Sequence, residues 1–215
     1  MLLNCRQHSK TETNTEKLSE IFVFSEKKFG YFVLFFRPFT YRARSSLQTI
    51  TCVRYTGIMK TNAMRILDGL GLGYEVLEYQ ISDETNEDIA LYSARVLGLA
   101  PEVVYKTIIM ENSSREHFVF CLPAGFSISL KKARAVTGSA EVDLMKTDKL
   151  LALTGYVRGG VSPLGMKRRF PTFICDLAQL EEYVYVSGGL RGVSLKIKPQ
   201  DLAKACDASF SDFVQ

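Results

Sequence analysis

The sequence predicts an α+β domain with a mixed β-sheet over residues 59–215. Segments with helical apolar spacing alternate there with segments of strand pattern, and glycine or proline separates them. The composition, with 47% hydrophobic and 23% charged residues, is typical of a chain that buries a core. The almost wholly apolar segment 103–110 is typical of a central strand.

The helices are predicted from apolar residues three and four positions apart, followed by a glycine that suits a left-handed cap. Ser129 and Thr147 are expected to cap the third and fourth helices, and Pro199 occupies the first turn of the last one. The expected ranges are 62–70, 87–97, 130–137, 148–154 and a final helix from residue 199.

The strands are predicted from short apolar or alternating segments. In the last of them, apolar residues at 193, 195 and 197 alternate with polar ones. The expected ranges are 73–79, 103–110, 118–122, 172–176, 183–187 and 193–197.

Residues 1–58 differ in charge and in apolar pattern from the rest of the sequence. We expect them to lie outside the functional fold, with Met59 as the natural start. They hold nine basic and four acidic residues, a net charge of +5, whereas residues 59–215 carry −1 of the chain's total of +4. The apolar run 31–36 is far shorter than the roughly 20 residues that cross a bilayer. A polar opening argues against a secretory signal, and four glutamates argue against a transit peptide. We therefore expect a cytoplasmic protein without membrane association.

Common catalytic and metal motifs are missing from the sequence. The five cysteines are scattered and only two histidines occur, which argues against a disulfide framework and a zinc site. The sequence Gly69-Leu-Gly-Leu-Gly73 follows a helix and lacks the spacing of a dinucleotide loop. His117 is expected at a surface or strand edge. No metal and no cofactor are expected.

Two glycine-rich segments and one lysine stand out. Residues 154–165, here the glycine loop, contain four glycines and a proline, which is typical either of a tight turn or of a backbone that a ligand approaches closely. Lys167–Arg169, the basic triplet, form either a solvated face or a phosphate site. The second glycine turn, residues 187–192, adds Arg191. Lys106 interrupts an apolar strand, either at a sheet edge or directed into a pocket.

At these residues the chain resembles the YbaK/EbsC family, the Cys-tRNA(Pro) deacylases related to the editing domain of prolyl-tRNA synthetase. The resemblance covers residues 59–215, where several motifs occur in the family's order. They are Leu97-Gly-Leu, Val104-Tyr-Lys-Thr107, Leu130-Lys-Lys132, Thr154-Gly-Tyr, Gly159-Gly-Val-Ser-Pro-Leu-Gly165, Arg169-Phe-Pro-Thr172 and Tyr185-Val-Ser-Gly-Gly-Leu-Arg-Gly192.

The resemblance implies a barrel-like mixed sheet with flanking helices and assigns roles to individual residues. Lys106 would bind the 3′ end of the tRNA and orient the ester. The backbone of Gly159 and Gly160, followed by Val161, Ser162 and Pro163, would hold the aminoacyl group and the oxyanion. Further substrate contacts match Tyr79, Thr107 and Ser187.

Two positions depart from the family pattern. Ile89 occupies a position where the best-known deacylase of this family has phenylalanine, and Ser194 a position where that deacylase has aspartate. These two differences put the fine substrate preference in doubt. Contacts with tRNA phosphates are expected from Lys167, Arg168, Arg169 and Arg191.

The implied function is removal of cysteine from mischarged Cys-tRNA(Pro), as a hydrolase or lyase, with prolyl-tRNA synthetase as a possible partner. The thiol of the substrate would attack its own ester, so Cys121, Cys175 and Cys206 of the protein would not be needed. A deacylase for another small amino acid, such as Ala-tRNA(Pro), and a noncatalytic tRNA-binding module are the alternatives.

Overall fold

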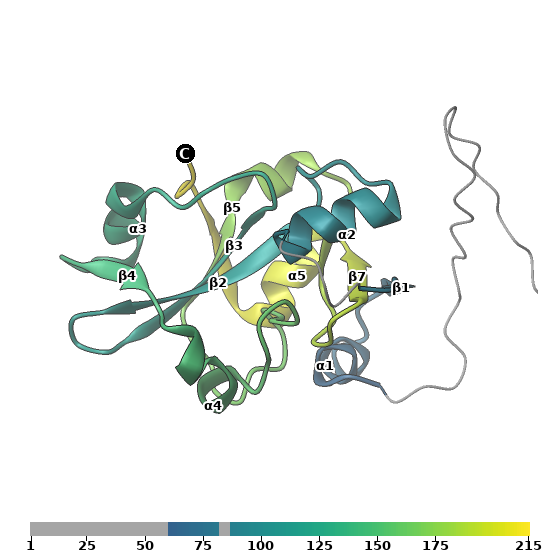
Figure 1. The fold of residues 1–215 in the computed structure, drawn as a ribbon, viewed down its shortest axis with the longest axis horizontal. Helices are drawn as coiled ribbons and strands as arrows, with labels where there is room; N and C mark the ends of the chain where they lie inside the picture. Colours follow the sequence, from purple (N-terminus) through teal and green to yellow (C-terminus); the bar gives the residue numbers. More distant parts are fainter. Residues whose placement is uncertain (1–59, 82–86) are drawn as a thin grey trace, which may run out of the picture. The chain divides into compact units, whose positions relative to one another are not determined.

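The computed structural model describes residues 60–81 and 87–215, which form five α-helices, two 3-10 helices and eight strands (Figure 1). The expectation that residues 1–58 lie outside the functional fold falls on positions outside this description. The helices are α1 (Asn62–Gly69), α2 (Ile89–Leu97), α3 (Leu130–Thr137), α4 (Leu150–Thr154) and α5 (Pro199–Cys206), with η1 (Thr147–Lys149) and η2 (Asp176–Leu180). The strands are β1 (Tyr74–Glu78), β2 (Tyr105–Asn112), β3 (His117–Pro123), β4 (Val142–Leu144), β5 (Thr172–Cys175), β6 (Val184–Ser187), β7 (Val193–Ile197) and β8 (Ala208–Ser211).

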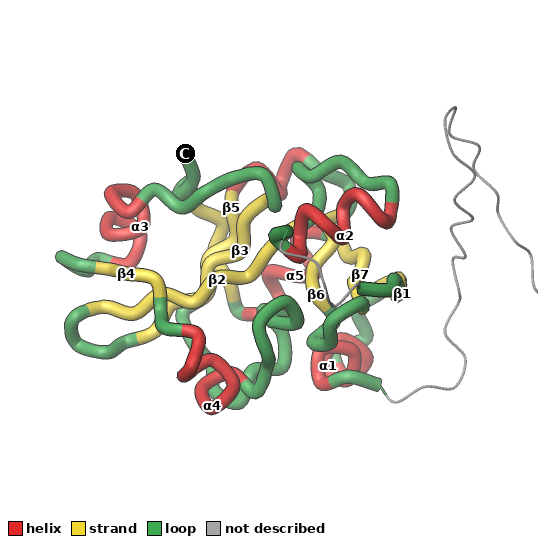
Figure 2. The backbone as a smooth tube through the Cα atoms, viewed as in Figure 1, coloured by secondary structure: helices red, strands yellow, loops and turns green. Residues whose placement is uncertain are grey.

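The strands form two open sheets, which confirms the α+β class with a mixed sheet. The smaller sheet has the order β1-β7-β6 and is antiparallel. The larger one has the order β4-β2-β3-β5-β8, with antiparallel pairs around β2 and parallel pairs around β5. Figure 2 shows the strands of the larger sheet crossing the domain and those of the smaller one gathered at one end.

The two sheets meet at the start of β2. Val104 forms an isolated parallel bridge with Tyr185 of β6, and the Tyr185 N–H donates to the carbonyl of Val103 over 2.9 Å. Farther along, β4 pairs only with residues 110–112 of β2. Between these two points β2 has β3 on one side and no strand on the other among the described residues. This stretch of open edge, residues 105–108, faces the cavity described below.

An aromatic cluster holds the larger sheet to the C-terminal segment. Phe120 is fully buried on β3, with its ring centroid 5.3 Å from that of Phe173 and 4.8 Å from that of Phe213. Burying each such ring contributes about 1.5–3 kcal/mol. The Phe213 carbonyl also accepts from Ser129 N–H over 2.8 Å, which ties the last residues to the start of α3.

Most predicted elements are confirmed within one or two residues. Gly98, Gly138 and Gly155 have left-handed φ angles of 66°, 67° and 85° at the ends of α2, α3 and α4. The expectation for Thr147 was wrong: it opens the 3-10 turn η1, and α4 begins only at Leu150. Ser129 occupies the N-cap position of α3 without a side-chain hydrogen bond.

Candidate active site

A cavity of about 650 Å3 lies along the open edge of β2. Its walls come from the N-terminal half of α2, the segment 144–150, the glycine loop and the second glycine turn. This volume is typical of a small-molecule site. Because the cavity faces the edge of β2, two successive residues, Lys106 and Thr107, both line it, although their side chains leave the strand on opposite faces.

Lys106 is held at the cavity by two partners. Its ammonium donates to the carbonyl of Ala124 over 2.9 Å and lies 3.4 Å from Oδ2 of Asp88. The other carboxylate oxygen of Asp88 accepts from Ala90 N–H over 2.8 Å, so Asp88 is also the N-cap of α2. An ammonium has three N–H groups, which leaves one for a ligand. Lys106 therefore lies at an open sheet edge and also lines a cavity, so both structural descriptions of this lysine apply.

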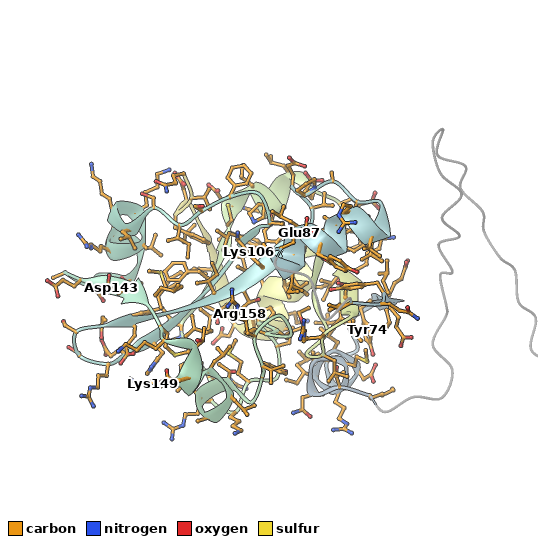
Figure 3. The ribbon with its side chains drawn as sticks, in the orientation of Figure 1. Tyr74, Glu87, Lys106, Asp143, Lys149 and Arg158 are labelled. Carbon is orange, nitrogen blue, oxygen red and sulfur yellow. The ribbon has the colours of Figure 1, made fainter. Side chains whose placement is uncertain are left out.

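Figure 3 shows the surroundings of this lysine. Lys106 and Arg158 are labelled near the centre of the view, close to Glu87, which precedes α2, whereas Asp143 and Lys149 lie toward β4 and α4. Glu87 pairs with Arg95 of α2 over 2.9 Å, while Arg158 forms no ion pair with another described residue.

Tyr79 contributes a neutral hydrogen-bonding group to the cavity. Burial raises the pKa of its phenol above the usual value, and hydrogen bonds with Ser93 and Ser194 lower it in part. Ser93 in turn donates to the carbonyl of Ala90 over 2.9 Å. Both serines are buried and, like Tyr79, line the cavity. Ser194 is thus part of the site as a hydroxyl group in place of a carboxylate.

The glycine loop reaches the cavity with only some of its residues. Gly159 and Val161 line the cavity, as do Thr107 and Ser187, whereas Gly160, Ser162 and Pro163 do not. The Gly160 N–H donates to the carbonyl of Val157 over 3.0 Å. The N–H groups of Gly159 and Val161 donate to no described residue, so both of these cavity-lining residues keep a backbone donor free.

The buried part of the loop supports it from behind. Ser162 is fully buried, and its Oγ accepts from Leu164 N–H over 3.3 Å. The hydroxyl of Tyr156 donates to the Leu164 carbonyl over 2.6 Å. Gly160 is closely packed, because a Cβ there would lie 3.1 Å from the Arg191 backbone nitrogen, and the turn would have to shift by a few tenths of an ångström.

Three of the four expected phosphate contacts lie away from the cavity. Lys167, Arg168 and Arg169 are exposed and line no part of it, and the Lys167 ammonium donates to the carbonyl of Leu151 over 3.3 Å. Arg191 does line it, as does Ile89. A Cβ on Gly159 would lie 3.0 Å from Cγ1 of Ile89 and 3.6 Å from Nε of Arg191.

Sequence reasoning missed Asp88 and Arg158. Asp88 carried a signal, because an aspartate directly before a helix is a common N-cap, but its contact with Lys106 is visible only in three dimensions. Arg158 stands in the glycine loop that the sequence did single out.

The histidine and the cysteines of the described residues lie outside the cavity. His117 packs edge-on against Phe170, and its Nε2 is 4.0 Å from a Glu111 carboxylate oxygen. Burial raises the pKa of Cys121 to about 12 and that of Cys175 to about 11. Cys206 also has a raised pKa because of burial. None of the three thiols is a ready nucleophile at neutral pH.

Comparison with known proteins gives the class to which this fold and site correspond. The family model described as "Aminoacyl-tRNA editing domain" matches residues 89–205. The chain belongs to this aminoacyl-tRNA editing family.

Among curated relatives, EbsC of Enterococcus faecalis (strain ATCC 700802 / V583) is 31% identical over 153 residues, which cover 71% of this chain and 92% of EbsC. Its name gives it provisionally as a Cys-tRNA(Pro)/Cys-tRNA(Cys) deacylase.

Solved structures share the fold at low sequence identity. The structure of hypothetical protein APE2540 is 21% identical, with a TM-score of 0.65 over 72% of this chain and 100% of that one. A protein described provisionally as a trans-editing enzyme for prolyl tRNA synthetase is also 21% identical, with a TM-score of 0.62 over 70% and 93%. Within residues 60–81 and 87–215, no helix combines the length and apolar character needed to cross a bilayer.

Proposed function

We propose that this protein removes cysteine from mischarged Cys-tRNA(Pro) and that the thiol of the substrate is the nucleophile. The observation that carries this proposal is the composition of the cavity. Lys106 lies at its edge with one N–H available, yet no cysteine or histidine occurs among the described residues that line it. The name of the relative EbsC, with its cysteine-specific substrates, supports the same choice of amino acid.

The reaction needs no nucleophile from the protein. The cysteine thiol loses its proton to solvent and its sulfur attacks the ester carbonyl carbon. The bond to the terminal ribose oxygen breaks, and this oxygen takes up a proton. The amino acid leaves as a cyclic thiolactone, which water later opens to cysteine. Holding both groups of one molecule in an attacking geometry supplies much of the rate.

The residues around the cavity divide the remaining tasks. Lys106 orients the ester, and the amides of Gly159 and Val161 donate to the oxygen that becomes negative. Tyr79, with Ser93 and Ser194, presents neutral hydroxyl groups to the aminoacyl moiety. We expect tRNA-Pro as the nucleic-acid partner, prolyl-tRNA synthetase as a possible protein partner, and activity in the cytoplasm.

A deacylation assay on a panel of aminoacyl-tRNA(Pro) tests the proposal. Cys-tRNA(Pro) should be cleared, Ser- and Ala-tRNA(Pro) should be nearly inert, and S-methylation of the substrate thiol should abolish turnover. A cavity that measures only size separates amino acids that differ by one small group by about 1–3 kcal/mol, so sharper discrimination points to the thiol.

The same panel separates the alternatives. Comparable rates on Ala-tRNA(Pro), which has no thiol, would refute the thiol mechanism and favour a deacylase for small amino acids in general. Binding of every tRNA without turnover of any would favour the noncatalytic tRNA-binding module.

A further inference from the structure

The charges around the cavity are unevenly paired. Of the two carboxylates that line it, Asp88 is occupied by Lys106 and the α2 backbone, and Glu87 is occupied by Arg95. Two exposed cations that line the cavity, Arg158 and Arg191, form no ion pair with a described residue. A site with two uncompensated guanidinium groups attracts an anionic ligand.

These two arginines come from turns that touch each other. Arg158 precedes Gly159, and a Cβ on Gly159 would lie 3.6 Å from Nε of Arg191. The next residue, Gly160, lies against the backbone of Leu190 and Arg191, at 3.3 Å and 3.1 Å from the same kind of added Cβ. The glycine loop and the second glycine turn therefore present the two arginines from one packed unit at the cavity wall.

We propose that Arg158 and Arg191 together bind a backbone phosphate of the single-stranded 3′ end of the tRNA. This inference rests on the proposed function, which places the terminal ester beside Lys106. A guanidinium binds a phosphate through two parallel hydrogen bonds, and the forks of two such groups can share one phosphate. The basic triplet lies outside the cavity, so its members would meet phosphates farther from the ester.

The experiment measures binding of an unacylated, fluorescently labelled single-stranded RNA that ends in CCA, as a function of salt, to the full chain. Arg158→Gln and Arg191→Gln should each weaken binding about tenfold or more, because each removes charge-assisted hydrogen bonds. Because the two arginines share one phosphate, the double variant should lower the slope of log affinity against log salt by about 0.7, the value for one phosphate contact on a single strand, and each single variant should lower it by less. Arg134 is an exposed residue of α3 that does not line the cavity, so Arg134→Gln is the matched control and should leave the affinity and the slope unchanged.

A second variant keeps the inference testable if Arg158→Gln folds poorly. Arg158→Lys retains the charge without the fork, so it should keep the salt slope but lose affinity. Adenosine has no phosphate, so its inhibition constant against RNA binding should be the same in every variant. An affinity and slope of Arg158→Gln equal to those of Arg134→Gln would overturn the proposal. Because the RNA carries no amino acid, this outcome is independent of whether Cys-tRNA(Pro) is deacylated.

Discussion

Replacing Asp88 with asparagine separates the two contacts that this side chain makes. Asparagine caps a helix about as well as aspartate, so its side-chain oxygen can still accept from Ala90 N–H. The charge that holds Lys106 at 3.4 Å is lost. Since 41% of the Asp88 side chain is exposed, solvent screens the pair, and its contribution to stability is about 1 kcal/mol or less. We expect the melting temperature to fall by no more than about 4 °C.

The expected effect on catalysis is larger than the effect on stability. Without the carboxylate, the Lys106 ammonium keeps only the Ala124 carbonyl as a partner and can move away from the ester. A misplacement of about 1 Å can cost about 100-fold in rate, so kcat/KM on Cys-tRNA(Pro) should fall between about tenfold and 100-fold. Steady-state deacylation and thermal unfolding of the same protein sample measure the two effects.

The chain offers a matched control for this experiment. Lys132 has the same two kinds of partner as Lys106: its ammonium donates to an Asp212 carboxylate and to the Val214 carbonyl, each over 2.9 Å. Asp212→Asn breaks an equivalent pair outside the cavity and should leave kcat/KM unchanged. Asp88→Ala should cost about 1 kcal/mol more stability than Asp88→Asn, because it also removes the helix cap.

A double-mutant cycle decides how Asp88 acts. If it acts through Lys106, adding Asp88→Asn to Lys106→Gln should lower kcat/KM no further. Additive losses, or a wild-type kcat/KM for Asp88→Asn alone, would refute the positioning role.

Three other predictions concern the lysine, the basic triplet and the leader. Lys106→Ala should lower kcat/KM by orders of magnitude with a stability change of about 1 kcal/mol; near-normal turnover would reject its role. Neutralising Lys167, Arg168 and Arg169 should weaken tRNA binding for all sequences and lower the slope of log affinity against log salt by roughly one unit per lost contact. An unchanged slope would show that these three residues contact solvent and not tRNA. A chain that starts at Met59 should fold and deacylate like the full chain, as circular dichroism and the same assay would show; loss of folding would contradict the proposed domain boundary.

The periodicity of the sequence was sufficient for the helices and the central strands but not for the short edge strands. β4 has only three residues, Val142–Leu144, which are too few to establish a period of two in the sequence. β8 follows α5 after Asp207, which adopts a left-handed φ of 53° at the cap position where α2, α3 and α4 have glycine. The usual punctuation was absent there, and only pairing with β5 identifies residues 208–211 as a strand.

The candidate site was predictable where one residue contradicts its local pattern. Lys106 stood out because a charged residue inside an apolar strand needs a reason. Asp88 did not stand out, because helix capping already explains an aspartate at that position. Its second role depends on a contact across 18 residues of sequence, which follows from the way β2 passes the start of α2. Local patterns contain no information about such a contact.

The state of the thiols bears on which group attacks the ester. Burial raises the pKa of Cys121 to about 12, and its Sγ lies 3.9 Å from the Thr107 hydroxyl. A thiol with this pKa is almost fully protonated at neutral pH and has no access to the cavity. A cysteine attached to tRNA is a solvated thiol with an ordinary pKa of about 8.5, so a few per cent is thiolate at neutral pH. These pKa values favour the proposal that the reactive thiolate comes from the substrate and that the protein positions the ester and stabilises the oxyanion.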